Sequence, residues 1–273
     1  MPTAKPTLTA ALRAEYQLLF DTCQILADKR ASVEAVVGSI DGARLRYEVV
    51  AAKLSVPWYV IGVIHNMEGG LNFMTHLHNG DPLTAQTVQV PKGRPKDGDP
   101  PFSWEDSAVD ALKLQGYDVW DDWSIPGTLF KWERYNGWGY RNYHPDVKSP
   151  YLWSFTNQYT SGKYVKDGIW DPTAISKQVG AACVLRRLAE LGKLEAVAFD
   201  TTEPELAQAM VDGESGALRY APNVVTPGGV ALQAFLNTFP RIFLREDGKL
   251  GARTSDAYRL VFGHYLTGDP RAD

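Results

Sequence analysis

The stretch VPWYVIGVIHNMEGG, residues 56–70, predicts an apolar helix with a single carboxylate near its end. Ser55 and Pro57 favour the start of a helix, and the two final glycines favour its termination. Glu68 stands directly before those glycines, among apolar neighbours that disfavour its ionisation. The C-terminal end of a helix also disfavours negative charge, which argues against an ordinary solvated glutamate. We therefore interpret Glu68 as a candidate general acid, a group that must keep its proton near neutral pH.

Further helices are predicted on both sides of this stretch. Apolar residues recur at spacings of three and four over residues 8–27 and 43–54. Capping residues at the start and glycines at the end mark several more. These additional helices are predicted over residues 103–116, 124–137, 171–192, 226–239 and 254–266.

Residues 75–101, THLHNGDPLTAQTVQVPKGRPKDGDPP, differ from this helical pattern. Alternating threonine and valine between turn residues predicts short strands and a long exposed loop. The fold class expected is therefore mainly α, an α+β domain with one small β excursion. All eight tryptophans lie between Trp58 and Trp170, which separates a main domain from the rest of the chain. We expect domains at residues 1–200 and 227–273, joined by a connector at 201–226.

Composition restricts the partners of this chain. Its 44% hydrophobic and 22% charged residues are typical of a globular protein, and a net charge of −4 argues against nucleic-acid binding. Cys23 and Cys183 lie in apolar helical segments, which favours buried free thiols over a disulfide. Arg13 and Glu15 interrupt the place where a signal peptide would need an apolar core. We expect synthesis in the cytoplasm and no stable membrane insertion.

A second carboxylate, Asp81, follows in the turn of HLHNGDPL, residues 76–83. In an inverting glycosidase such a residue activates a water molecule across the sugar from the acid. A turn stabilised by the Asp81 side chain before Pro82 is the alternative.

Histidines near these carboxylates leave another chemistry open. The residues His65, His76 and His78 are of metal-ligand type, although their spacing is not that of the H-E-x-x-H helix motif. Imidazoles of this kind also bind sugar hydroxyls or backbone groups. We expect His76 and His78 to contact substrate, and no metal or other cofactor.

Aromatic and amide residues crowd into ERYNGWGYRNY (133–143) and SPYLWSFTNQYTSGKY (149–164). Aromatic faces stack on pyranose rings and amides bind hydroxyl and acetamido groups, so this mixture is typical of a saccharide groove. An aromatic core that includes Trp132 and Trp153 is the alternative. The candidate substrate-binding residues here are Tyr135, Asn136, Trp138, Tyr140, Asn157, Gln158 and Tyr159.

These motifs resemble the lysozyme-like superfamily, in particular goose-type lysozymes and soluble lytic transglycosylases. More narrowly, roughly residues 55–190 are similar to phage and prophage endolysin-like proteins. The resemblance implies that Glu68 is the catalytic acid, that Asp81 is the second carboxylate, and that Tyr135 and Tyr159 are cleft tyrosines. The glutamate–serine pair of the transglycosylases is replaced by Glu68-Gly69, which favours hydrolysis.

The C-terminal pattern resembles the small peptidoglycan-binding module. It consists of Leu232-Gln233 followed by a DG-x-x-G-x-x-T-x-x-A motif over residues 247–257. The candidate wall-binding residues are Gln233, Asp247 and Thr254. A structural cap on the main domain is the alternative, because glycines and a threonine cap also serve a turn and a helix start.

The sequence therefore predicts a muramidase of endolysin type. It would cleave the β-1,4 bond between N-acetylmuramic acid and N-acetylglucosamine in peptidoglycan glycan strands. The alternatives are a lytic transglycosylase acting on the same bond, a non-catalytic wall-binding protein, and a metal-dependent hydrolase that uses the three histidines. Action in the periplasm or cell wall would require release by a holin or a secretion device.

Overall fold

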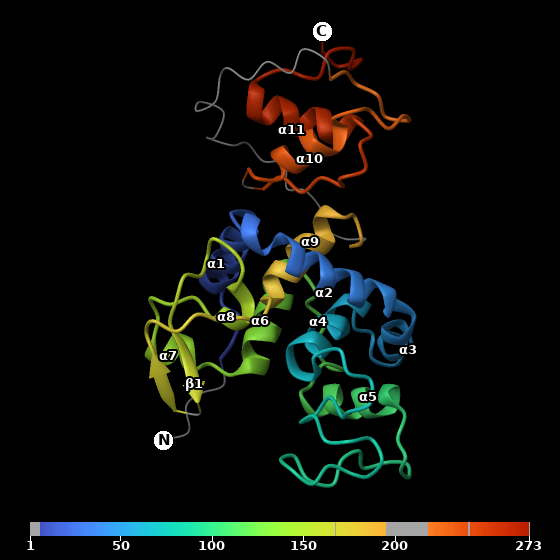
Figure 1. Cartoon of the computed structure of the whole chain (residues 1–273), viewed down its shortest axis with the longest axis vertical. Helices are drawn as coiled ribbons and strands as arrows, with labels where there is room; N and C mark the ends of the chain where they lie inside the picture. Colours follow the sequence, from blue (N-terminus) through green and yellow to red (C-terminus); the bar gives the residue numbers. More distant parts are fainter. Residues whose placement is uncertain (1–5, 167, 195–217, 240, 273) are drawn as a thin grey trace. The chain divides into compact units, whose positions relative to one another are not determined.

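The computed structural model describes residues 6–166, 168–194, 218–239 and 241–272. It is mostly helical with a small two-stranded sheet (Figure 1), which confirms the prediction of a mainly α chain. Contacts within the chain divide it into two compact units, Met1–Leu185 and Arg186–Asp273. The division falls inside one helix, earlier than the domain end expected at residue 200.

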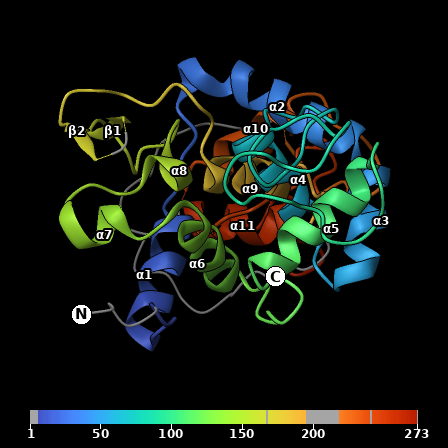
Figure 2. The same ribbon diagram turned by 90° about the horizontal axis from the view of Figure 1, so that it is seen from below.

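The first unit consists of helices of very different length around one apolar helix, α4 (Trp58–Gly69). The helix α5 (Trp104–Leu114) lies beside α3 (Arg44–Leu54), as Figure 2 shows, and α1 (Ala10–Asp21) contacts α6 (Ile125–Asn136). The other elements of this unit are α1 (Ala10–Asp21), η1 (Ala27–Lys29), α2 (Arg30–Gly42), α3 (Arg44–Leu54), α5 (Trp104–Leu114), α6 (Ile125–Asn136), α7 (Gly139–Tyr143), α8 (Pro150–Trp153), β1 (Lys163–Lys166) and β2 (Ile169–Asp171), and α9 (Ala181–Glu190) continues into the second unit.

The middle of α4 is buried because its residues are mostly apolar on every side. Residues from Val60 to Asn66 are all buried in it. A Cβ atom at Gly62 would come within 2.6 Å of Ile40 and 3.1 Å of Tyr47. The absence of a side chain at Gly62 therefore lets α2 and α3 approach α4 closely.

The small sheet does not lie where the sequence predicts it. The strands β1 and β2 pair antiparallel within residues 163–171, with Tyr164 opposite Trp170. Residues 75–101 contain one isolated bridge, between Thr75 and Pro82, and otherwise form turns and loops. The expected β excursion is wrong at this place because its many prolines lack the N–H groups that a strand ladder needs.

Two helix predictions also need correction. The helix predicted over residues 171–192 begins only at Ala181. Asp171 accepts hydrogen bonds from the amides of Thr173 and Ala174, so it closes a turn rather than starting a long helix. The helix predicted over residues 8–27 ends at Asp21.

The second unit has a core between α10 (Gly229–Leu236) and α11 (Ala252–Phe262). Leu218 and Tyr220 pack against that core, and Ala221 pairs with Leu250. The described end of the expected connector therefore belongs to this unit, whereas residues 201–217 of it lie outside the described part. The core residues are Leu232, Leu236, Ile242, Leu244, Leu250, Ala257, Tyr258, Val261 and Leu266.

Both cysteines, Cys23 and Cys183, are buried, as their apolar neighbours predict. Among the described helices, none is by itself long and apolar enough to cross a membrane. The helices α3 and α4 pass that test only as a pair, with a bend of 113° at the break between them.

Candidate active site

Glu68 lies in the last turn of α4, where Gly70 adopts a left-handed conformation and donates its N–H to the carbonyl of His65. The side chain keeps contact with solvent, but other groups surround its carboxyl closely. The hydroxyl of Tyr151 donates a hydrogen bond to Oε1 of Glu68 at 2.9 Å. Burial raises the pKa of Glu68 above its ordinary value, and the Tyr151 bond acts in the opposite direction. The structure thus places an accessible carboxyl with a raised pKa at the helix end.

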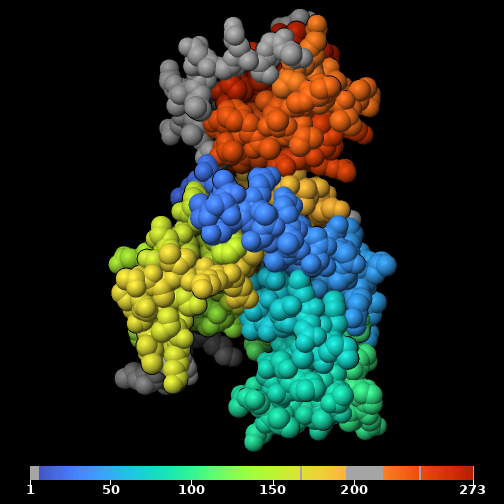
Figure 3. Space-filling model, in the orientation of Figure 1, coloured from blue at the N-terminus to red at the C-terminus, as the bar shows by residue number. Residues whose placement is uncertain are grey.

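The surface of the first unit is hollowed between two lobes, visible in Figure 3 as a teal lobe and a yellow one. The teal lobe contains the loop that follows α4, and the yellow lobe contains the β1–β2 hairpin. The bond from Tyr151 to Glu68 joins α8 to the end of α4, across 83 positions in sequence.

Three tyrosines respond to the charge of Glu68, although only Tyr151 bonds it, and we call Tyr117, Tyr135 and Tyr151 the tyrosine cluster. Burial is the largest influence on these phenols and raises the pKa of each. The negative charge of Glu68 acts on all three in the same direction. Because they stay protonated at physiological pH, these hydroxyls are available to donate hydrogen bonds.

Tyr117 is positioned by a turn directly after α5. Gly116 has a φ of +66°, which a residue with a side chain rarely adopts, and the amide of Tyr117 returns to the carbonyl of Leu112. Lys131 of α6 donates hydrogen bonds to the carbonyls of Gln115 and Gly116 at 3.1 and 2.7 Å. The Lys131 ammonium also lies 4.6 Å from the centre of the Tyr117 ring. The turn is therefore fixed from the α6 side.

Asp81, the predicted second carboxylate, holds its own loop together. Its Oδ2 accepts hydrogen bonds from the amides of Val88 and Gln89, at 2.8 and 3.0 Å, and from the side chain of Asn79 at 3.1 Å. The bonds from Gln89 and Val88 are the main reason why the pKa of Asp81 is lowered. This geometry matches the alternative in which Asp81 stabilises a turn.

The three histidines are also engaged in the fold. His76 bonds the Ser107 hydroxyl at 2.7 Å and the Ala85 carbonyl at 2.8 Å, whereas His78 bonds Asp110 at 2.8 Å. His65 is fully buried and bonds the Tyr47 hydroxyl at 3.1 Å. Burial lowers the pKa of His65 to about 4, so its ring is neutral. Within the described ranges, no group of three or more histidines, cysteines and acidic residues could hold a metal ion.

Several predicted sugar contacts hold other segments in place. Asn157 exchanges hydrogen bonds with the backbone of Gln24 and Thr22, and Gln158 donates to Leu19 and Thr22 at the end of α1. The hydroxyl of Tyr159 donates to the carbonyl of Gly162 and accepts from the amide of Ser176. These three residues are therefore committed to the fold.

The remaining candidates lie in different surroundings. Tyr135 belongs to the tyrosine cluster, and Asn136 ends α6 as an exposed residue. Trp138 contacts Phe130, with ring centres 5.7 Å apart. Tyr140 accepts a hydrogen bond from the Tyr164 amide. Trp132 and Trp153 are buried in the core, as the alternative interpretation predicts.

The three candidate wall-binding residues form one network inside the second unit. The Gln233 side chain donates to Asp247, to the Lys249 carbonyl and to Thr254, at 3.1 to 3.2 Å. Its carbonyl oxygen accepts from the amide of Gly248 at 2.7 Å. Gln233 is only 1% exposed, so the network stabilises the turn at residues 247–249 from inside.

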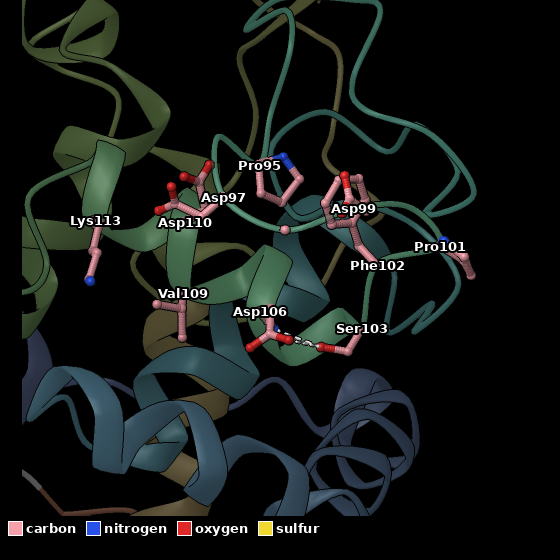
Figure 4. A pocket seen from close by; sticks show the side chains of 11 residues that line it. Pro95, Asp97, Asp99, Pro101, Phe102, Ser103, Asp106, Val109, Asp110 and Lys113 are labelled. Atoms are coloured by element: carbon pink, nitrogen blue, oxygen red, sulfur yellow. Dashed lines mark hydrogen bonds between the residues drawn. The ribbon is translucent and has the colours of Figure 1, made fainter.

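A separate pocket of 350 Å³ lies between α5 and the loop before it (Figure 4). Asp97, Asp99, Asp106 and Asp110 give it an acidic lining, and Glu68 is not part of it. Asp106 accepts from Ser103 and Lys53, and Asp110 accepts from Arg94 and His78. Two of its four carboxylates are thus already paired with basic side chains.

Sequence reasoning missed Tyr117 and Tyr151 as site residues. Tyr117 follows Gly116 in a turn signal, but nothing local to either tyrosine indicates a contact with Glu68. Tyr151 lies in the aromatic stretch 149–164 that predicts a saccharide groove, so composition gave a general signal for it, whereas nothing in the sequence indicated Tyr117.

Neither family models, nor curated proteins, nor solved structures include a match to this chain. The functional inference therefore depends on the site geometry and on the residues that form it.

Proposed function

We propose that the protein cleaves the β-1,4 glycosidic bond between N-acetylmuramic acid and N-acetylglucosamine in peptidoglycan, with Glu68 as the general acid. The observation that supports this proposal is the accessible Glu68 carboxyl, which has a raised pKa and a bond from Tyr151. A general acid for glycoside cleavage needs a proton that is still present near neutral pH. Burial at the end of an apolar helix supplies that condition.

In the proposed reaction, the Glu68 proton moves to the glycosidic oxygen as the C1–O bond breaks, and the bonding electron pair stays with that oxygen. In hydrolysis, water then adds to C1 and a base removes its proton. Hydrolysis by a muramidase therefore requires a base that removes the proton of this water molecule. Asp81 is the expected base. Because its Oδ2 already accepts three hydrogen bonds within its loop, its role as the base stays a prediction.

A second candidate, lytic transglycosylation on the same bond, is favoured by one specific observation. Asp81, the expected base, has an Oδ2 that already accepts three hydrogen bonds within its own loop. Transglycosylation needs no second carboxylate, because the C6 hydroxyl of muramic acid attacks C1 and its proton returns to the Glu68 carboxylate. The product is then a 1,6-anhydro sugar instead of a reducing end.

Purified peptidoglycan incubated with wild type, Glu68→Gln and Glu48→Gln separates these possibilities. Glu48 is a matched control, since its carboxylate pairs with Arg44 on the surface of α3. We expect wild type and Glu48→Gln to release muropeptides and Glu68→Gln to release none. Mass spectrometry then distinguishes reducing-end muramic acid from the 1,6-anhydro product, which is 18 Da lighter.

Three other results would contradict the proposal and favour a different function. Full release by Glu68→Gln would exclude Glu68 as the acid, and loss of that release on chelation would point to a metal-dependent hydrolase. Sedimentation of wild type with peptidoglycan and no release at all would indicate a wall-binding protein without catalysis.

A further inference from the structure

Residues 176–180, which precede α9, contact both helices that carry the Tyr151–Glu68 bond, and we call them the bridging segment. The side-chain amide of Gln178 donates a hydrogen bond to the carbonyl of Met67 at 2.9 Å. Met67 directly precedes Glu68 in the last turn of α4. The bond crosses 111 positions in sequence, so the fold of the chain, and not local geometry, brings Gln178 to this carbonyl.

The other contacts of the bridging segment are with the end of α8. The amide of Gly180 donates to the carbonyl of Ser154, which ends α8, at 3.1 Å. A Cβ atom at Gly180 would lie 2.3 Å from the carbonyl oxygen of Leu152, so glycine is needed for the two backbones to approach this closely. The hydroxyl of Ser154, which is fully buried, donates to the carbonyl of Ser176 at 3.5 Å. Both ends of the segment are thus held against α8, close to Tyr151.

These contacts close a ring of three links. Gln178 joins the bridging segment to α4, and Gly180 joins the segment to α8. The Tyr151 hydroxyl then joins α8 to the Glu68 carboxyl at 2.9 Å. Hydrogen bonds linked in this way support one another, so the loss of one link weakens the others.

The Met67 carbonyl is also electrostatically important for Glu68. The helix α4 ends at Gly69, so this carbonyl is one of the last four, which have no partner inside the helix. Such carbonyls carry the negative end of the helix dipole. The Gln178 amide is exposed and uncharged. It therefore holds the last turn of α4 and reduces the negative potential beside Glu68 without adding a charge of its own.

We propose that Gln178 is a positioning residue, which holds the last turn of α4 so that Glu68 stays within reach of the Tyr151 hydroxyl. The proposal rests on the assignment of Glu68 as the general acid. Proton transfer requires the acid to lie within hydrogen-bond distance of the glycosidic oxygen. A displacement of about 1 Å can lower the rate about a hundredfold, so the last turn of α4 must be held in place.

The direct test is a carbon-13 NMR titration of the Glu68 carboxyl in the full chain, which needs no substrate. Methionine is about as long as glutamine and has no donor. We expect Gln178→Met to raise the Glu68 midpoint by about half a pH unit, since it uncovers the Met67 carbonyl and weakens the Tyr151 bond. An unchanged midpoint overturns the proposal. The other titratable groups coupled to Glu68 keep their protons over this range, and they are Tyr117, Tyr135 and Tyr151.

Gln86→Met is the matched control for this titration. Gln86 is also exposed, and its side-chain amide donates to the carbonyl of Pro95 at 2.9 Å, the same distance as from Gln178 to Met67. We expect Gln86→Met to leave the Glu68 midpoint unchanged. An equal shift in Gln86→Met and Gln178→Met contradicts the proposal.

A double-mutant cycle distinguishes positioning from a general loss of stability. If Gln178 acts through the Tyr151–Glu68 bond, Gln178→Met should shift the Glu68 midpoint less in a Tyr151→Phe background than in wild type. Equal shifts in the two backgrounds would show that Gln178 does not act through this bond, and the proposal would be wrong.

Activity is measured separately, so the two ideas fail separately. If the protein cleaves peptidoglycan, Gln178→Met should lower kcat about tenfold with KM unchanged, because the proposal gives Gln178 no contact with substrate. A raised KM with an unchanged kcat contradicts it. If Glu68→Gln is fully active while Gln178→Met still shifts the Glu68 titration, the assignment of Glu68 as the acid fails and the positioning by Gln178 stands.

Discussion

The hydroxyl of Tyr151 lies 2.9 Å from Oε1 of Glu68 and joins the end of α4 to α8. This bond favours the charged form of Glu68, whereas burial of the carboxyl favours the neutral form and has the larger effect. The pKa of Glu68 is therefore raised while the Tyr151 hydroxyl orients its side chain. A carboxyl in this state is suited to proton donation rather than to a permanent charge.

The first prediction concerns stability and pH. Because the folded-state pKa of Glu68 lies above its unfolded value, the chain is stabilised by the neutral form below the unfolded pKa. That contribution is lost as pH rises through the folded pKa. We expect the melting temperature of Glu68→Gln to exceed that of wild type by an amount that grows with pH. Parallel curves for the two proteins would show that Glu68 has an ordinary pKa.

The second prediction concerns Asp81. Its Oδ2 already accepts three hydrogen bonds within its loop. We expect Asp81→Asn to keep kcat within about tenfold of wild type, whereas loss of a general base costs about 10²- to 10⁴-fold. Asp81→Ala should lower the melting temperature more than Asp81→Asn does. A loss of a thousandfold in Asp81→Asn, with an unchanged melting temperature, would restore Asp81 as the base.

The third prediction concerns Gln233 in the second unit. Gln233→Ala removes four hydrogen bonds of a buried side chain, so we expect a loss of about 2–4 kcal/mol in urea unfolding. Lys249→Ala is the matched control, because Lys249 contributes only its backbone to this network and its side chain is exposed. Unchanged unfolding of Gln233→Ala, together with weaker sedimentation on peptidoglycan, would favour direct wall binding by Gln233.

The fourth prediction concerns Lys131 beneath Tyr117. Burial, and then Arg134, lower the pKa of Lys131 to about 8, against an opposing effect of Asp118. Between that value and the unfolded pKa of 10.5, the unfolded chain binds more protons, so stability rises with pH. We expect wild type to gain stability from pH 8 to about pH 9.5, below the range of tyrosine ionisation. Lys131→Met should lack that gain, and an equal gain in both proteins would contradict the shift.

The apolar helix and its terminal Glu68 could be predicted from the sequence because both depend on neighbouring residues. Burial of α4 follows from its composition, and its end follows from two glycines. Helix starts were predicted best where a local cap exists, as at Ser103 and Ser124. Local rules were sufficient for these elements.

The surroundings of Glu68 could not be predicted, since they depend on contacts between distant segments. Tyr151 reaches Glu68 across 83 positions, and Asn157 bonds Gln24 across 133. Composition alone makes Asn157 and Tyr159 resemble sugar-binding residues, yet the fold uses their polar groups to satisfy backbone atoms. The prediction of strands at residues 75–101 is wrong for a related reason: side chains and prolines, not strand pairing, organise that backbone.

The account depends most directly on Glu68 as the proton donor. The measurement is the rate of muropeptide release from peptidoglycan by Glu68→Gln relative to wild type, with circular dichroism to show that both are folded. We expect a fall of at least about a thousandfold in Glu68→Gln, since the amide has no acidic proton to transfer. A folded Glu68→Gln protein that releases muropeptides at the wild-type rate would contradict the account.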